Sequence, residues 1–85
     1  MNHELKILSV YFRQVVDGNK TFEIRDNTDR DFKKGDTVEL QELGLNPKTV
    51  TGKRQAVKIT YVTNYNQPAN QVVFSFKLIN SVSDL

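Results

Sequence analysis

The sequence predicts a mainly β domain of the α+β class, with one or two short helices and its strands arranged as a small, largely antiparallel barrel. Two observations lead to this fold class. About five segments alternate apolar and polar residues with the period of a strand, and turn residues separate them at intervals of roughly ten positions. One segment near the start has helical spacing instead. With 85 residues the chain can build one hydrophobic core, so we expect residues 1–85 to form a single domain.

The first two expected elements are a strand and a helix. Residues 3–7 alternate in polarity, which predicts an opening strand. Residues 10–17 place apolar side chains at helical spacing, and Gly18 suits the left-handed position just past a helix end. Ser9 is the expected N-cap, because its hydroxyl can accept a hydrogen bond from a backbone N–H of the first turn. We expect this helix to cover one side of the barrel.

Residues 20–25 form the second expected strand. Because side chains alternate along a strand, Phe22 and Ile24 point to one side of it, whereas Thr21, Glu23 and Arg25 share the other. On an ideal strand the Cα atoms of Glu23 and Arg25 lie roughly 7 Å apart. The two charged side chains are therefore expected to act on the same face.

A polar, turn-rich loop follows over residues 26–31. We interpret its aspartates as shaping the turn rather than binding a metal, because the calcium-loop pattern with its closing glutamate is missing. These aspartates are Asp26, Asp29 and Asp31. Phe32 is expected to anchor the loop to the core.

The second half of the chain predicts three more strands. They are expected over residues 37–41, 54–63 and 72–79, with loops over 44–52 and 64–70. Alternation in the longest strand places Tyr61 on the face of Val57 and Ile59, as a core or rim residue. The last strand has apolar residues on both faces, which is typical of a central strand. The polar tail 80–85 is expected to fray.

The composition excludes several classes of protein. The chain has no cysteine, which excludes disulfides and thiolate metal sites. No apolar run approaches the roughly 20 residues that span a bilayer, and the start lacks a signal-peptide pattern. We therefore expect a cytoplasmic protein without membrane contact. Twelve Lys and Arg against ten Asp and Glu give a net charge of +2, which permits a phosphate-bearing partner without requiring one.

The stretch Gly-Asn-Lys-Thr-Phe-Glu-Ile-Arg over residues 18–25 resembles the signature of the ASCH superfamily, whose barrels are related to the PUA domain of RNA-modifying enzymes. Residues 3–7, 22–25, 30–36 and 59–62 also resemble, in the same order, a short bacterial and phage branch of that superfamily without a settled function. The resemblance spans most of the chain. It implies a PUA-like barrel and an RNA-linked role, with the ligand between the helix and the signature strand.

The resemblance also bears on catalysis. One member of the superfamily is an acetylcytidine amidohydrolase, and its catalytic lysine matches Lys20. Its catalytic threonine falls at the place of Glu23, and its catalytic glutamate lies in a longer segment that this chain lacks. One catalytic residue of three carries over, so the resemblance favours a binding module over an enzyme.

The charged residues of positions 20–25 indicate the same binding site without the resemblance. Lys20 and Arg25 are two cations beside one anion, Glu23, within six positions of one another. Arginine can make two parallel hydrogen bonds to a phosphate, and lysine adds a mobile charge. Glu23 can accept from a base amino group or orient Arg25. The alternative is a surface strand with an ordinary ion pair, which stabilises a protein by about 0–1 kcal/mol.

Three residues outside this strand are further candidates for the site. Arg30 can add a phosphate contact from the following loop, or be an exposed loop cation. Tyr65 lies among asparagine and glutamine residues, where its ring can stack on a base or cover the barrel mouth. His3 is the one histidine of the chain; it can titrate near neutral pH and serve as an acid or base, whereas a lone histidine near a terminus is typically exposed or structural.

Three hypotheses for the function follow. The first is an RNA- or nucleotide-binding module, which acts through Lys20, Thr21, Glu23, Arg25, Arg30 and Tyr65. The second is a hydrolase of a modified nucleoside or RNA, with Lys20 as nucleophile or base and Glu23 as acid/base partner. The third is a protein-interaction domain that uses an exposed strand edge. We expect no cofactor and no metal, and a monomer as the default state.

Overall fold

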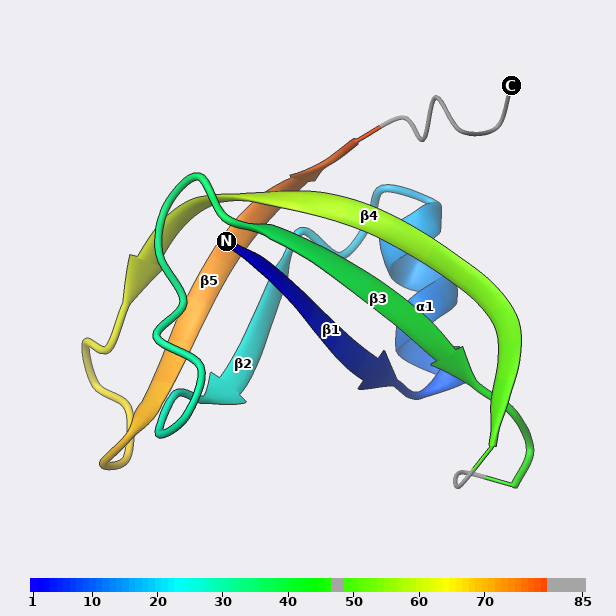
Figure 1. Cartoon of the computed structure of the whole chain (residues 1–85), viewed down its shortest axis with the longest axis horizontal. Helices are drawn as coiled ribbons and strands as arrows, with labels where there is room; N and C mark the ends of the chain where they lie inside the picture. The colour runs from blue at the N-terminus through cyan, green and yellow to red at the C-terminus, as the bar shows by residue number, and fades with distance from the viewer. Residues whose placement is uncertain (47–48, 80–85) are drawn as a thin grey trace.

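The computed structural model describes residues 1–46 and 49–79. Within these residues one helix and five strands form, and the strands make one sheet in the order β1-β3-β4-β5-β2 (Figure 1). The elements are β1 (Asn2–Ile7), α1 (Ser9–Val16), β2 (Phe22–Asp26), β3 (Thr37–Leu43), β4 (Val50–Thr63) and β5 (Gln71–Leu78). The predicted class, mainly β with a short helix after the first strand, is confirmed.

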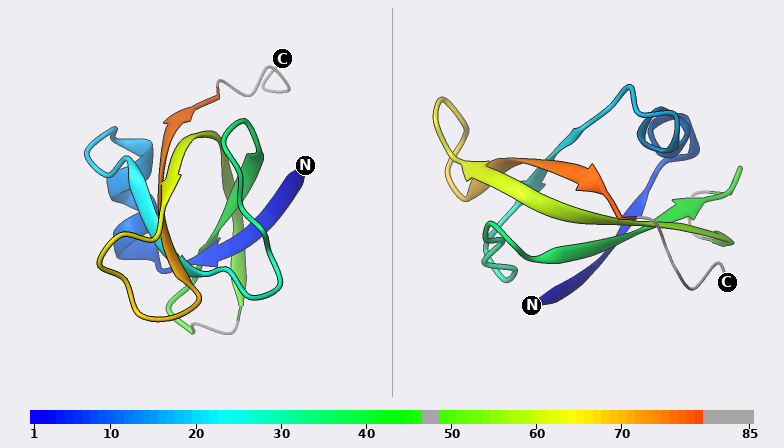
Figure 2. Two further views of the ribbon diagram at one scale, coloured as in Figure 1. Left: turned by 90° about the vertical axis from the view of Figure 1, so that its left-hand side faces the viewer. Right: turned by 90° about the horizontal axis from the view of Figure 1, so that it is seen from above.

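The sheet curls into a half-barrel. β1 pairs with β3 in parallel, and the three other neighbouring pairs are antiparallel. β1 and β2 are the two edges of the sheet, and Figures 1 and 2 show the sheet curling so that these edges approach each other. The expected small, largely antiparallel barrel is therefore realised as a half-barrel with one open side.

The core fills the inside of this half-barrel. Its buried apolar residues are Leu5, Ile7, Phe12, Val15, Phe32, Val38, Leu40, Val57, Ile59, Val72, Phe74 and Phe76. α1 contributes Phe12 and Val15, which bury an apolar helix face. Phe32 anchors the loop after β2 as predicted, because its ring centroid lies 4.9 Å from that of Phe74. β5 lies between β4 and β2, which confirms the central position expected for the last strand.

The start of α1 differs from the prediction. The N-cap is Leu8, which makes no side-chain capping hydrogen bond, and Ser9 is already the first helical residue. The Ser9 hydroxyl donates instead to Glu42 of β3, at 2.8 Å. The expectation that Ser9 caps the helix was therefore wrong, because its hydroxyl donates its hydrogen bond to a carboxylate across the fold. Gly18 has φ +82°, the left-handed conformation expected after the helix.

A bulge in β4 changes the position of Tyr61. Ile59 pairs with Phe76 and Tyr61 pairs with the adjacent Ser75, so Thr60 is an extra residue in β4. The bulge reverses the inside–outside alternation beyond it, and Tyr61 is 63% exposed. The expectation of a core or rim position for Tyr61 was wrong for this reason. β4 also begins at Val50, earlier than predicted.

Part of the sequence interpretation falls outside the described residues. The expected loop 44–52 includes residues 47 and 48, and the tail expected to fray is 80–85. Among the described residues, no helix has the length and apolar character needed to cross a membrane.

Candidate functional site

β2 presents charged residues to the inside of the half-barrel and apolar residues to the outside. Glu23 is buried and pairs with Phe74, whereas Arg25 is partly buried and pairs with Val72. Residues directly opposite in an antiparallel pair share a face, so both charged side chains lie beside the core. Phe22 and Ile24 are 44% and 50% exposed on the other face. The prediction that Glu23 and Arg25 share one face is confirmed.

Lys20 and Arg25 both bind the carboxylate of Glu23. Lys20 Nζ donates to Glu23 Oε2, and Arg25 Nε donates to Glu23 Oε1 at 3.0 Å. The Glu23 side chain is 6% exposed, that of Lys20 17% and that of Arg25 26%. We call these three residues the Glu23 triad. Its two cations and one anion give it a formal charge of +1, with each cation partly accessible to solvent.

Lys20 lies between α1 and β2. Its ammonium donates to the carbonyl oxygen of Phe22 at 2.6 Å and lies 4.7 Å from the centroid of the Phe22 ring. The ring of Tyr11, on α1, is 5.7 Å from the same nitrogen. Both distances are within the range of a cation–π interaction. Lys20 is therefore held by a carboxylate, a carbonyl and two aromatic faces.

Arg25 also connects the two edges of the sheet. Its Nη2 donates to the carbonyl oxygen of Lys6 at 3.0 Å, so a side chain of β2 reaches the backbone of β1. A guanidinium has five N–H donors. Within the described part of the chain, Arg25 uses one of them on Glu23 and one on Lys6. Its three other N–H groups make no hydrogen bond within these residues.

The other residues predicted for the site lie outside the Glu23 triad. Thr21 is exposed, and its carbonyl accepts from the backbone N–H of Phe76 at 3.0 Å. Arg30 lies in a turn of the loop after β2, and its side chain makes no hydrogen bond or ion pair within residues 1–46 and 49–79. Tyr65 is 80% exposed in the β4–β5 loop. The structure thus brings together Lys20, Glu23 and Arg25 only.

Arg30 and Tyr65 belong to two neighbouring loops. The backbone N–H of Asn27, at the end of β2, donates to the carbonyl of Asn70 at 2.7 Å and ties these loops together. Figures 1 and 2 place both loops on the side of the half-barrel away from α1. Candidate residues therefore gather in two places, at the Glu23 triad and at this loop end.

His3 is a structural residue. It is buried, its Nε2 is 2.9 Å from Asp36 Oδ2, and its ring centroid is 4.6 Å from that of Phe32. Burial alone raises the pKa of Asp36, but the hydrogen bonds from His3 and from the backbone of Lys33 outweigh it, so the pKa is lowered. Of the two interpretations of His3, the structural one is confirmed.

Glu42 is a buried carboxylate that the sequence interpretation missed. Thr51 Oγ1 and Ser9 Oγ donate to its two oxygens at 2.8 Å each. These hydrogen bonds lower the pKa of Glu42, and the charges of Lys53 and Arg13 act in the same direction. The sequence did contain a signal for its burial, because Glu42 follows Val38 and Leu40 on the inward-facing side of β3. It was overlooked because a carboxylate at such a position is rarely buried.

The geometry excludes one class of site within the described residues. No group of three or more histidine, aspartate or glutamate side chains is placed to hold a metal ion there. The Glu23 triad is suited to bind an anion rather than a metal ion. It offers several oriented N–H donors and one net positive charge, which is the pattern that binds phosphate or carboxylate groups.

Comparison with known proteins gives two matches. A model of the family described as "Domain of unknown function (DUF3850)" matches residues 2–76. An "Uncharacterized 12.9 kDa protein in GpA 3'region" of Escherichia phage P2 is 30% identical over 83 residues, which are 98% of this chain and 73% of the phage protein. Neither description names an activity.

Proposed function

The chain belongs to the DUF3850 family, and from this premise we propose that it is an RNA- or nucleotide-binding module whose phosphate site is the Glu23 triad. The observation that carries the proposal is the convergence of Lys20 and Arg25 on one buried carboxylate. A surface strand with an ordinary ion pair needs only one cation for each anion. The second cation leaves the triad with a net positive charge, and both cations are partly accessible to solvent.

The triad is organised in advance for an anion. Lys20 has three N–H donors and uses two, on Glu23 and on the carbonyl of Phe22. Together with the three free donors of Arg25, this leaves four N–H groups that can donate to phosphate oxygens. Because Glu23 already fixes both cations, binding an anion costs less side-chain entropy than it would on a mobile surface.

Glu23 acts in this proposal as a positioning residue. Both of its carboxylate oxygens already accept from a cation, so reading a base amino group is the less suitable of its two predicted roles. We propose the remaining candidates as secondary contacts. Thr21 borders the triad in sequence, Arg30 adds a positive charge from the loop, and Tyr65 offers an exposed ring for stacking.

The test is a titration of fluorescently labelled single-stranded RNA at two salt concentrations. Binding should weaken at the higher salt, because phosphate contacts release counterions. Lys20→Ala should reduce affinity about tenfold, as expected for the loss of a charged hydrogen bond. Lys77→Ala is the matched control, because Lys77 is an exposed lysine of β5 that makes no ion pair within the described residues. Equal affinities of the two variants, or no binding by the wild type, would overturn the proposal.

The contact between Lys20 and Glu23 supports a second candidate, the hydrolase of a modified nucleoside or RNA. A neighbouring cation favours the uncharged amine that a lysine nucleophile needs, and Arg25 meets Lys20 at the same carboxylate, which can take up the proton that the amine loses. The protein would be incubated with acylated nucleosides and with acylated RNA. Lys20→Arg keeps the positive charge but cannot act as an amine nucleophile. Turnover that this variant abolishes supports the hydrolase, and the absence of product from the folded wild type rejects it.

A further inference from the structure

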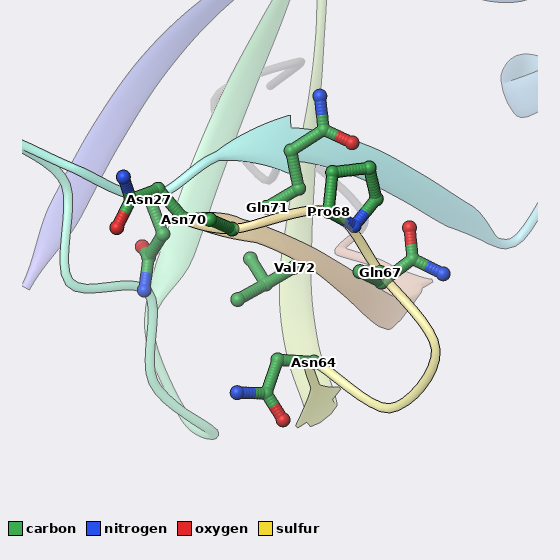
Figure 3. A pocket seen from close by; sticks show the side chains of 8 residues that line it. Asn27, Asn64, Gln67, Pro68, Asn70, Gln71 and Val72 are labelled. Carbon is green, nitrogen blue, oxygen red and sulfur yellow. The ribbon is translucent and has the colours of Figure 1, made fainter.

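A cavity of about 310 Å³ opens at the loop end of the half-barrel. It is formed by the end of β2, the β4–β5 loop and the start of β5. Its lining residues are Asn27, Asn64, Gln67, Pro68, Ala69, Asn70, Gln71 and Val72. Figure 3 shows the amide side chains arranged around Val72. We call this cavity the amide pocket.

The lining of the amide pocket has an unusual chemistry. Five of its eight residues carry a side-chain amide, and none carries an ionisable group. Each amide offers both donors and an acceptor. Val72 and Pro68 add apolar surface among them. Such a lining suits a small, uncharged ligand whose edge alternates donors and acceptors, and its volume is at the small end of ligand pockets.

Most of these amides are not used by the protein. The side chains of Asn64, Asn70 and Gln71 make no hydrogen bond to any residue in the ranges 1–46 and 49–79. Gln67 makes one long contact of 3.5 Å to the carbonyl of Tyr65. Asn27 accepts from the backbone N–H of Phe32 at 2.8 Å with its Oδ1, which leaves its NH₂ group available. The pocket therefore gathers unused donors and acceptors in one place.

The backbone around the pocket is fixed by local hydrogen bonds. The N–H of Gln67 donates to the carbonyl of Asn64, and that of Gln71 to Pro68, at 3.1 Å each. The bond from Asn27 to the carbonyl of Asn70 joins the two loops. Asn70 has φ +65°, a left-handed conformation that asparagine tolerates better than most residues. These hydrogen bonds hold the backbone that lines the pocket in a defined conformation.

The amide pocket adjoins the Glu23 triad along the sheet. Val72 in its lining is the register partner of Arg25, and Gln71 is the partner of Asp26. Register partners on antiparallel strands have Cα atoms about 5 Å apart. A ligand that reaches from the pocket across Val72 therefore comes close to Arg25, the cation of the Glu23 triad that lies on β2.

We propose that the amide pocket binds a nucleobase, whose edge forms hydrogen bonds to the asparagine and glutamine side chains while its ring contacts Val72 and Pro68. This chemistry matches the known use of these amides in reading base edges. The inference rests on the proposed function, because it names the part of the nucleotide that lies beyond the phosphate. It can be tested separately from the phosphate site, because a nucleoside without phosphate should also bind to the amide pocket.

The experiment follows the side-chain NH₂ signals of the ¹⁵N-labelled protein by NMR. Adenosine, guanosine, cytidine and uridine are added, then their 5′-monophosphates, and ribose 5-phosphate serves as the ligand without a base. We expect at least one nucleoside to shift the NH₂ signals of Asn64 and Gln71. The double variant Asn64→Leu, Gln71→Met should bind that nucleoside about tenfold more weakly. Gln14→Met, at an exposed amide of α1, is the control and should bind normally.

The outcomes separate this inference from the proposed function. If nucleosides shift the pocket signals and Lys20→Ala binds the monophosphates as well as the wild type does, the base pocket stands and the phosphate site fails. If monophosphates bind through Lys20 while the pocket signals stay unchanged, the base pocket is overturned and the phosphate site stands. If neither nucleosides nor monophosphates change the spectrum, both proposals are rejected.

Discussion

Arg25 of β2 donates a hydrogen bond from Nη2 to the carbonyl oxygen of Lys6 in β1, at 3.0 Å, and so links the two edges of the curled sheet. The same guanidinium binds the buried carboxylate of Glu23. One side chain of the proposed phosphate site is therefore also part of what holds the half-barrel together. Binding and stability should be coupled at this residue, and variants must be chosen to separate the two.

Replacement of Arg25 should destabilise the fold. Arg25→Met keeps much of the aliphatic stem but removes both hydrogen bonds, so we expect a loss of about 1–2 kcal/mol in the free energy of unfolding. Urea denaturation gives this quantity. Arg54→Met is the control, because Arg54 is two-thirds exposed and makes a 3.6 Å ion pair with Glu39, which should contribute little. Equal losses in the two variants would show that Arg25 does not bridge the sheet edges in solution.

Glu23 should be energetically coupled to Lys20. Glu23→Gln preserves the shape of the side chain but leaves two cations facing each other, so we expect a loss of about 2 kcal/mol in stability. In a Lys20→Met background the same substitution should cost less, by about 1 kcal/mol, because one of the two cations is then absent. A double-mutant cycle with urea unfolding measures the difference. Strict additivity of the two substitutions would contradict a direct interaction between the side chains.

The stability of the fold should fall at acid pH. The pKa values of Asp36 and Glu42 are lowered in the folded state from their ordinary values of 3.8 and 4.5. Their stabilising contribution is therefore complete above the ordinary values and is lost as the pH falls through the folded-state values. Free energies of unfolding measured from pH 6 downward should decrease below about pH 4.5.

Replacement of Asp36 by asparagine tests whether this carboxylate causes the loss of stability at acid pH. Asp36→Asn should lower stability at neutral pH and flatten the acid decrease, since one of the carboxyl groups with a lowered pKa no longer titrates. Asp29→Asn is the comparison, because Asp29 is exposed in the turn after β2 and makes no hydrogen bond within the described residues. An unchanged acid slope in Asp36→Asn would mean that Asp36 does not carry the effect.

Local patterns in the sequence predicted much of the fold because its strands alternate regularly and its turns carry the expected residues. Gly18 and Phe32 have the positions that were predicted for them. Alternation failed at Tyr61, because one inserted residue at Thr60 reverses the pattern and has no signature of its own in the sequence. A bulge of this kind is decided by the fit of β4 to β5, which a single strand does not reveal.

The candidate site was predictable where it is local and not where it depends on distant segments. The Glu23 triad falls within six positions, so strand periodicity alone could bring it together. The link from Arg25 to Lys6 spans 19 residues and depends on the curl of the whole sheet. The amide pocket combines Asn27 with the β4–β5 loop, and only the finished fold brings those segments together.

The hydroxyl of Ser9 should stabilise the fold through Glu42 rather than through α1. Ser9→Ala removes one of the two hydroxyl donors to this carboxylate, so we expect a loss of about 1 kcal/mol in the free energy of unfolding. An N-cap serine would produce a loss of similar size, which makes the single variant ambiguous. The two explanations differ in a Glu42→Gln background, where an amide no longer carries the charge that strengthens the hydrogen bond. If Ser9 acts on Glu42, the cost of Ser9→Ala should fall by about half in that background. If Ser9 capped the helix, the cost would be the same in both backgrounds, and the assignment of its hydroxyl to Glu42 would have to be withdrawn.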